Sequence, residues 1–283
     1  MLKRIIFLIG DQSQEDSVYR MKENMGEVGE MVEIRGAEER GGACISSKDR
    51  SGVIFVTDSA AVLRRLTAEG GYVIALLHDN NREEDLSAAP YAISDIEELE
   101  YASFEQAYLR LAGLPWKIAE TERCIIRETT VEDVDAFYHI YAEPSITRYM
   151  DKLYEDPEEE KEYIRQYIEK VYGFYGYGLW TVLDKEDGRV IGRAGVSWRE
   201  GFDIPEIGFV IAVPFQHKGY AYEVCRAVLE CSSRELGFTG VQALVKRGNE
   251  ASASLCRRLG FTRQGTVEDR GEKYEQYIIR LPC

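Results

Sequence analysis

The feature that most restricts the fold is an abrupt change of pattern between residues 205 and 238, where a strand gives way to a helix. The run PEIGFVIAV (205–213) is dense in apolar and β-branched residues, which is typical of a buried strand. The segment AYEVCRAVLECSSRELGF (221–238) instead carries apolar residues at helical spacing. Between them lies the elbow PFQHKGY, which contains Gly219 and is followed by the small residue Ala221. This succession is typical of an α/β fold.

The elbow also has a chemical consequence. The first N–H groups of a helix have no partner within the helix, and they carry the positive end of its dipole. Gly219 can adopt a positive φ, and Ala221 leaves room beside the backbone. Several N–H donors of residues 216 to 221 would then point toward one place. The pattern predicts an anion cradle for a phosphate or pyrophosphate.

Around the elbow, strands and helices follow one another in a regular order. Thr130 and Asp133 have the spacing of a capping box at the start of a helix. The sequence predicts strands at 124–128, 177–184, 189–198 and 240–247, helices at 130–143, 156–174 and 249–261, and two closing strands.

This order and two motifs resemble the GNAT N-acetyltransferase family. The elbow signature of that family, [QR]-x-x-G-x-[GA], is met by Gln216, Gly219 and Ala221. A second motif, N-x-x-[AS] followed by L-G-F, is met by Asn249, Ser252 and residues 259–261. The resemblance spans residues 122 to 281 and looks most similar to the branch that includes ribosomal-protein N-acetyltransferases. It implies a mixed, splayed central sheet with flanking helices over residues 122–283.

The resemblance implies an acyltransferase of the EC 2.3.1 type, which moves an acetyl group from acetyl-CoA directly to a primary amine without a metal. Its partner would be an amine-bearing small molecule or a peptide N-terminus. An alternative is a catalytically silent CoA-binding sensor in which the N-terminal domain is the output module. The residues implied to bind acetyl-CoA are Ile211, Ala212, Val213, Gln216, His217, Lys218, Gly219, Tyr220, Ala221, Asn249 and Ser252.

The catalytic groups are less clearly indicated. Glu206 begins the fourth strand, where several relatives carry a carboxylate that acts as the base, and Asp203 is a second candidate. Cys256 stands where many relatives have the tyrosine that protonates the leaving thiolate, but a cysteine in a helix is usually a packing residue. Tyr274 and Tyr277 are alternative acids.

The sequence of the first part of the chain predicts a separate, small parallel-sheet α/β domain of Rossmann-like type over residues 1–118. Strands are expected at 4–10, 52–58, 72–79 and 91–95, with helices at 59–71 and 103–113, and residues 27–49 show only weak periodicity. Residues 52–98 resemble a degenerate haloacid-dehalogenase-like segment, in which Asp58 would help to hold magnesium. The nucleophilic DxD pair of that family is missing at Asp11, so the domain is predicted to be non-catalytic, with phosphatase activity as the alternative.

Composition restricts the partners and the compartment. The formal net charge of −15 disfavours nucleic acid and anionic membranes and suits a cationic small molecule or a basic peptide. No apolar run approaches the ~20 residues that a membrane helix needs. The six cysteines, which include Cys44 and Cys283, show no CxxC pair, and this predicts a reducing compartment, the cytoplasm. The alternative of a homodimer is left open.

Overall fold

The computed structural model describes residues 1–36 and 51–282. Cys44, Cys283 and part of the weakly periodic stretch 27–49 therefore lie outside the described residues. The chain divides into two compact units, Met1–Leu114 and Pro115–Cys283, which are called unit 1 and unit 2. The division falls within the Gly- and Pro-containing segment 113–124.

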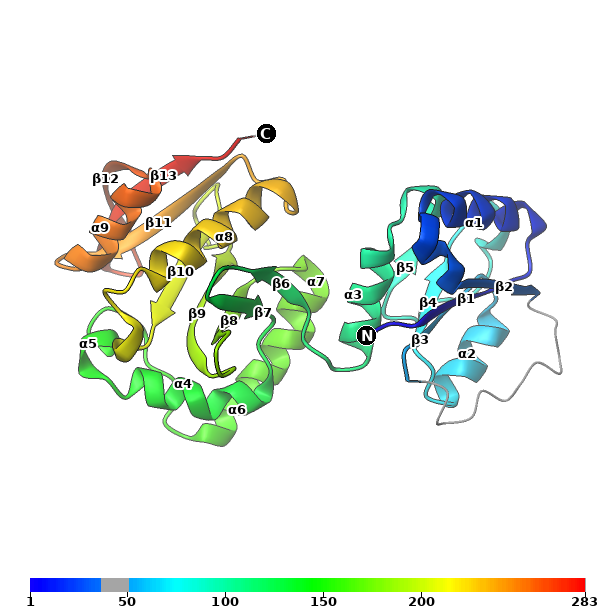
Figure 1. The fold of residues 1–283 in the computed structure, drawn as a ribbon, viewed down its shortest axis with the longest axis horizontal. Coiled ribbons are helices and arrows are strands. Elements are labelled where there is room, and N and C mark those ends of the chain that lie inside the picture. The colour runs from blue at the N-terminus through cyan, green and yellow to red at the C-terminus, as the bar shows by residue number, and fades with distance from the viewer. Residues whose placement is uncertain (37–50, 283) are drawn as a thin grey trace. The chain divides into compact units, whose positions relative to one another are not determined.

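Unit 1 is built on a parallel sheet with the strand order β2-β1-β3-β4-β5 (Figure 1). Every neighbouring pair is parallel, as the sequence predicts. Three short 3₁₀ helices accompany the longer elements: η1 (Gly26–Met31), η2 (Asp79–Asn81) and η3 (Ile96–Glu98). The strands are β1 (Arg4–Ile9), β2 (Val32–Gly36), β3 (Val53–Thr57), β4 (Val73–Leu76) and β5 (Ala92–Ile93), and the helices are α1 (Gln12–Asn24), α2 (Ala60–Ala68) and α3 (Tyr101–Leu111).

The sheet of unit 1 is buried on both faces because successive side chains of a strand point to opposite sides. Ile5 and Phe7 of β1 belong to one apolar cluster together with residues of α1 and α3. Ile6, which lies between them, belongs to a second cluster with residues of α2. All five residues of β3 are buried, which explains why this strand reads as a continuous apolar run.

Unit 2 contains an eight-stranded sheet with the order β12-β13-β11-β10-β9-β8-β7-β6 (Figure 1). All neighbours are antiparallel except β10 and β11, so the sheet is mixed, as predicted. The predicted elements did not include β6. The strands are β6 (Lys117–Glu120), β7 (Cys124–Arg127), β8 (Leu179–Asp184), β9 (Val190–Ser197), β10 (Glu206–Ile211), β11 (Gly240–Lys246), β12 (Thr262–Asp269) and β13 (Glu272–Arg280).

The helices of unit 2 begin where the sequence signals indicate. The capping box of Thr130 and Asp133 is present at the start of the first helical segment. Asp156 caps α6 by accepting a hydrogen bond from the N–H of Glu158 at 2.9 Å. The helical segments are η4 (Val131–Asp133), α4 (Val134–Tyr141), α5 (Pro144–Thr147), α6 (Pro157–Tyr167), η5 (Ile168–Tyr172), α7 (Gly173–Tyr175), η6 (Val213–Phe215), α8 (Tyr220–Arg234) and α9 (Glu250–Leu259).

The main apolar core of unit 2 joins the sheet to α8 and α9. Trp180 of β8 is 1% exposed and belongs to the same cluster as Val224 and Val228 of α8. Ala253 and Cys256 of α9 complete this side of the core. This packing fixes α8 against the sheet and thereby fixes the position of its N-terminus at the end of β10.

Candidate functional site

The sheet of unit 2 separates between β10 and β11. β10 pairs with β9 along its whole length, from Glu206 to Ile211. With β11, among the described residues, it shares one registered pair, Glu206 with Gln242. The edge of β10 that faces β11 is therefore without a ladder over most of its length, and its backbone groups are available to another extended chain.

The elbow connects this separated strand to α8. Gly219 is the N-cap of α8 and has a φ of 89°, in the left-handed region that favours glycine. His217 also has a positive φ, of 59°. No side chain caps the N-terminus of α8 in the described structure. Its first N–H groups are therefore available as the donors that the sequence predicts for the anion cradle.

Arg123, at the start of the domain, holds the elbow in place. Its backbone N–H and its Nε donate to the carboxylate of Glu223, at 2.8 and 2.7 Å. Its Nη1 donates to the carbonyl of Lys218 at 3.0 Å, and its guanidinium stacks over the ring of Tyr220. Arg123 thus neutralises the carboxylate in the first turn of α8 and ties that turn to β7.

Gln216 has a different place from the other elbow residues. Its Nε2 donates to the carbonyl of Ile211 at 2.8 Å, and its backbone N–H donates to the carbonyl of Val213 at 3.1 Å. The side chain therefore links the elbow to the end of β10. The N–H donors of the cradle begin after it, at His217 and Lys218, whose side chains are exposed.

The second motif lies at the start of α9. Asn249 is the N-cap of this helix, and its side-chain oxygen accepts a hydrogen bond from the N–H of Ser252 at 3.2 Å. The amide nitrogen of Asn249 remains as a donor. The neighbouring carbonyl of Gly248 accepts from the hydroxyl of Tyr149 at 2.8 Å, which ties this loop to the segment after α5.

Glu206 lies at the point where β10 and β11 separate, and it is not a free carboxylate. Arg199 Nη1 lies 3.0 Å from Glu206 Oε2, and Arg199 also pairs with Asp269. The side chain of Glu206 is 16% exposed. Burial raises the pKa of this carboxyl, while the hydrogen bond and charge of Arg199 oppose the increase.

Two of the other catalytic candidates, Tyr274 and Cys256, differ in their surroundings. Tyr274 of β13 lies next to Arg199, whose Nη2 is 3.5 Å from the tyrosine hydroxyl and whose guanidinium lies over the ring. The structure thus brings Tyr274 to the same cluster as Glu206. Cys256 is 1% exposed in the core of unit 2, and burial raises the pKa of its thiol to about 11. These properties favour a packing role for Cys256.

Two arginines that hold the site were absent from the residues selected in the sequence. Arg199 joins groups from β10, β12 and β13, and Arg123 joins β7 to α8. The signal available for Arg199 was its place in the loop between β9 and β10. No motif marks either residue, because Arg123 pairs with Glu223 and Arg199 with Asp269, and both partners are distant in the sequence.

The comparisons with known proteins agree with this geometry. Residues 123–262 match the family model described as an acetyltransferase (GNAT) domain. The uncharacterized protein YkkB of Bacillus subtilis is 29% identical over 147 residues, which are 50% of this chain and 84% of the relative. The uncharacterized N-acetyltransferase YoaA of the same organism is 28% identical over 175 residues, which are 58% of this chain and 96% of the relative.

Two solved structures show the same fold. A ribosomal-protein-S5-alanine acetyltransferase from Vibrio fischeri has a TM-score of 0.50 and 19% identity, covering 57% of this chain and 95% of its own. RimL, a ribosomal L7/L12 alpha-N-protein acetyltransferase, has a TM-score of 0.51 and 15% identity in its apo form, covering 60% of this chain and 97% of its own. Another RimL structure holds coenzyme A, which agrees with acetyl-CoA as the cosubstrate of this family. Residues 123–262 therefore form a domain of the GNAT acetyltransferase family.

Proposed function

We propose that this protein is an N-acetyltransferase that transfers the acetyl group of acetyl-CoA directly to a primary amine, on a small molecule or on a peptide N-terminus. The separation of β10 from β11 next to the uncapped N-terminus of α8 supports this proposal most strongly. It combines an unpaired strand edge for an extended chain with backbone donors for an anion.

The residues at the elbow suit the two parts of acetyl-CoA. The pyrophosphate would meet the N–H groups from His217 to Ala221, and Lys218 would add a positive charge. The extended pantetheine arm would lie along the free edge of β10 near Ile211 and Val213. Asn249, at the start of α9, would donate its amide N–H to the arm.

The chemistry needs a neutral amine and a place for its proton. The amine nitrogen forms a bond to the thioester carbonyl carbon, the carbon–sulfur bond breaks, and the thiolate leaves. Glu206 would take the proton of the amine, and burial, which raises the pKa of this carboxyl, makes it a stronger base. Tyr274, which lies beside Arg199, would protonate the thiolate, since Cys256 is buried in the core.

The acceptor would approach past an acidic segment. Asp151, Glu155 and Glu159 are exposed between α5 and the first turn of α6. Their charge would attract a cationic amine before it loses its proton. The choice between a small amine and a peptide N-terminus is open to direct measurement with a panel of acceptors.

The test is calorimetric titration of acetyl-CoA into the full chain and two variants. The variant Gly219→Asp places a negative side chain at the cradle. Gly237→Asp is the matched control, because Gly237 also has a positive φ, of 66°, but follows the other end of α8. We expect micromolar binding by the wild type and by G237D, and a loss of at least ~100-fold with G219D, since the anion would meet a carboxylate in place of free donors.

A folded wild-type chain that does not bind acetyl-CoA would overturn the proposal. If acetyl-CoA binds but no amine releases free CoA thiol, the second candidate gains support: a silent CoA-binding sensor with unit 1 as its output. The pairing of Glu206 with Arg199 and the buried thiol of Cys256 are the observations that keep this candidate in consideration.

A further inference from the structure

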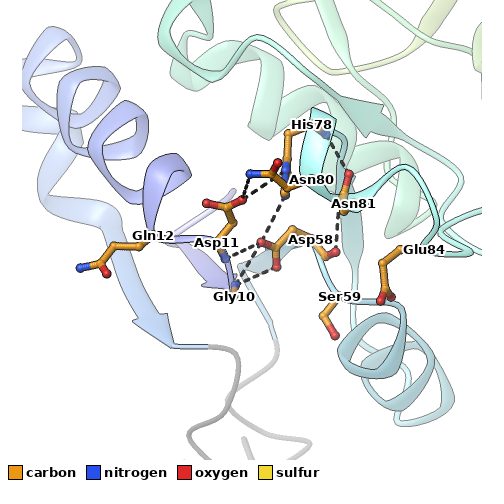
Figure 2. A pocket seen from close by; sticks show the side chains of 9 residues that line it. All are labelled: Gly10, Asp11, Gln12, Asp58, Ser59, His78, Asn80, Asn81 and Glu84. Atoms are coloured by element: carbon orange, nitrogen blue, oxygen red, sulfur yellow. Dashed lines mark hydrogen bonds and ion pairs between the residues drawn. The ribbon is translucent and has the colours of Figure 1, made fainter.

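Unit 1 contains a pocket that plays no part in the proposed acetyl transfer. Its volume is about 450 Å³, which lies within the ~300–1,000 Å³ usual for small-ligand sites (Figure 2). Its lining comes from the residues that follow the carboxyl ends of β1, β3 and β4. Gln12, Asn80 and Glu84 are exposed at the rim, so the pocket is open to solvent.

The pocket lies where the topology of a parallel sheet places ligands. From β1 the chain moves to β2 on one side, and then crosses to β3 on the other side of β1. The order of connection therefore reverses between β1 and β3. In open α/β sheets, small molecules bind outside the carboxyl ends of the strands at such a switch point. Asp11 and Asp58 follow the two strands that flank it.

The hydrogen bonds of Asp58 disfavour a phosphate group in this pocket. The carboxylate of Asp58 accepts hydrogen bonds from the N–H of Gly10, at 2.9 Å, and from the N–H of Asp11, at 3.0 Å. These backbone donors are the ones that would otherwise receive a phosphate. Since they are already bound to a carboxylate of the chain itself, a phosphate would find neither free donors nor a favourable charge.

The remaining lining is acidic. Asp11 caps α1 by accepting from the N–H of Ser13 at 2.8 Å, and it accepts from Asn80 at 2.6 Å. These hydrogen bonds lower its pKa to about 2, so it is ionised at neutral pH. Glu84 accepts from the N–H of Ala60 at 2.8 Å. No lysine or arginine lines the pocket among the described residues, so its lining holds three carboxylates and one imidazole.

The imidazole of His78 also indicates that the pocket binds a ligand. Its side chain is 8% exposed, and neither ring nitrogen has a hydrogen-bond partner in the described structure. Nε2 lies 3.4 Å from Asp58 Oδ2, and Nδ1 lies 3.6 Å from Asp11 Oδ2 (Figure 2). A buried ring nitrogen without a hydrogen bond is costly. A neutral imidazole offers one acceptor nitrogen, and the two carboxylates beside it offer acceptor oxygens.

We propose that this pocket of unit 1 binds a small organic cation that carries ammonium or guanidinium groups, whose N–H donors are shared among Asp11, Asp58, Glu84 and His78. A bare metal ion fits less well, because no group of three or more His, Cys, Asp or Glu side chains in the described residues is placed to hold one. The proposal is independent of the acetyltransferase reaction, since all of its residues lie in unit 1.

The test is calorimetric titration of spermidine into the full-length protein and into the variants Asp11→Asn, Glu84→Gln and Asp16→Asn. Asparagine caps a helix about as well as aspartate, so D11N removes a charge from the pocket and keeps α1. Asp16→Asn is the matched control, because Asp16 is exposed on the same helix and does not line the pocket. We expect D11N and E84Q to weaken binding at least ~10-fold each, and D16N to change it less than ~2-fold.

Three results would overturn the proposal. One is the absence of spermidine binding at millimolar concentration by the folded protein. Another is equal binding by D11N, E84Q and D16N, which would indicate association with the acidic surface or with the acetyl-acceptor region of unit 2. The third is tighter binding of inorganic phosphate or Mg²⁺ than of spermidine. If D11N does not fold, the comparison of E84Q with D16N tests the proposal. E84Q should fold, because a glutamine oxygen can still accept the hydrogen bond from the N–H of Ala60. Acetyl-CoA binding, measured separately, reports on the proposed transferase function.

Discussion

At the scale of single residues, the decisive contact is the pair formed by Arg199 and Glu206. The carboxylate lies at the point where β10 and β11 separate, and burial and the arginine act on its pKa in opposite directions. A base must be deprotonated to accept a proton, so the acetylation rate should fall as the pH decreases through the pKa of Glu206. Arg199 affects the pH at which the rate falls, because it changes the pKa of Glu206. It is a positioning residue in this sense.

Replacing Arg199 by glutamine should therefore move the acidic limb of the pH–kcat/KM profile to higher pH. The reason is that burial continues to raise the pKa of Glu206 while the opposing charge is lost. The measurement is the CoA-thiol release rate against pH with one accepted amine. Arg199→Lys keeps the charge and should shift the limb less. A Glu206→Gln variant with an unchanged rate and profile would contradict the role of Glu206.

The residues of this pair also show the limit of prediction from sequence. Gly219, Ala221 and Asn249 belong to short motifs whose spacing follows from a strand, a turn or a helix start, so the sequence alone selects them. Arg199 contacts side chains from β10, β12 and β13, and only the fold brings these together. Gln216 was selected for the cofactor, and its side chain proves to bind the carbonyl of Ile211.

At the scale of elements, Asp133 connects the start of a helix to the sheet. The capping box that the sequence predicts is present, with Asp133 accepting from the N–H of Thr130 at 2.9 Å. The same carboxylate also receives both Nη groups of Arg127 at 2.7 Å and the hydroxyl of Thr181 at 2.8 Å. Its side chain is 5% exposed, so the residue predicted as part of a capping box is also a buried link between η4, β7 and β8.

Asp133→Ala should lower the free energy of unfolding of unit 2 by about 3–5 kcal/mol, because Arg127 would keep a buried charge without its partner. Asp135→Ala, in the exposed first turn of α4, should change it by less than ~0.5 kcal/mol. All three tryptophans lie in unit 2, so urea unfolding followed by tryptophan fluorescence reports on this unit. Equal losses in the two variants would contradict the role given to the pair of Asp133 and Arg127.

Element boundaries were predicted well where a local signal exists and poorly where it does not. Asp156 and Pro157 gave the start of α6, and the apolar runs gave β8 to β11 within a few residues, while the helix predicted to residue 174 divides into α6, η5 and α7. β6 has only Ile118 and Ala119 as apolar residues, and it was assigned to the linker. It is a strand because β7 offers an edge to pair with, which is a tertiary cause.

At the scale of the whole molecule, the chain is two α/β units with different sheets and, on our proposals, different ligands. In the described residues no helix is long and apolar enough to cross a membrane. The cradle, Arg123, Glu206 and Asn249 all belong to unit 2, whereas the acidic pocket belongs to unit 1. The division after Leu114 can be tested with truncated chains.

A chain that begins at Pro115 should fold and bind acetyl-CoA within ~3-fold of the full-length affinity. A chain that begins at Glu122 should be less stable, because it lacks β6 and the contacts of Trp116, which donates to Glu128 Oε2 at 3.2 Å and accepts from the N–H of Glu128 at 2.9 Å. The loss also exposes the edge of β7, next to the buried residues Cys124 and Ile126. Urea unfolding of both chains, with acetyl-CoA calorimetry, measures the difference. Failure of the longer chain to fold would show that unit 2 depends on unit 1, and equal stability would show that β6 contributes little.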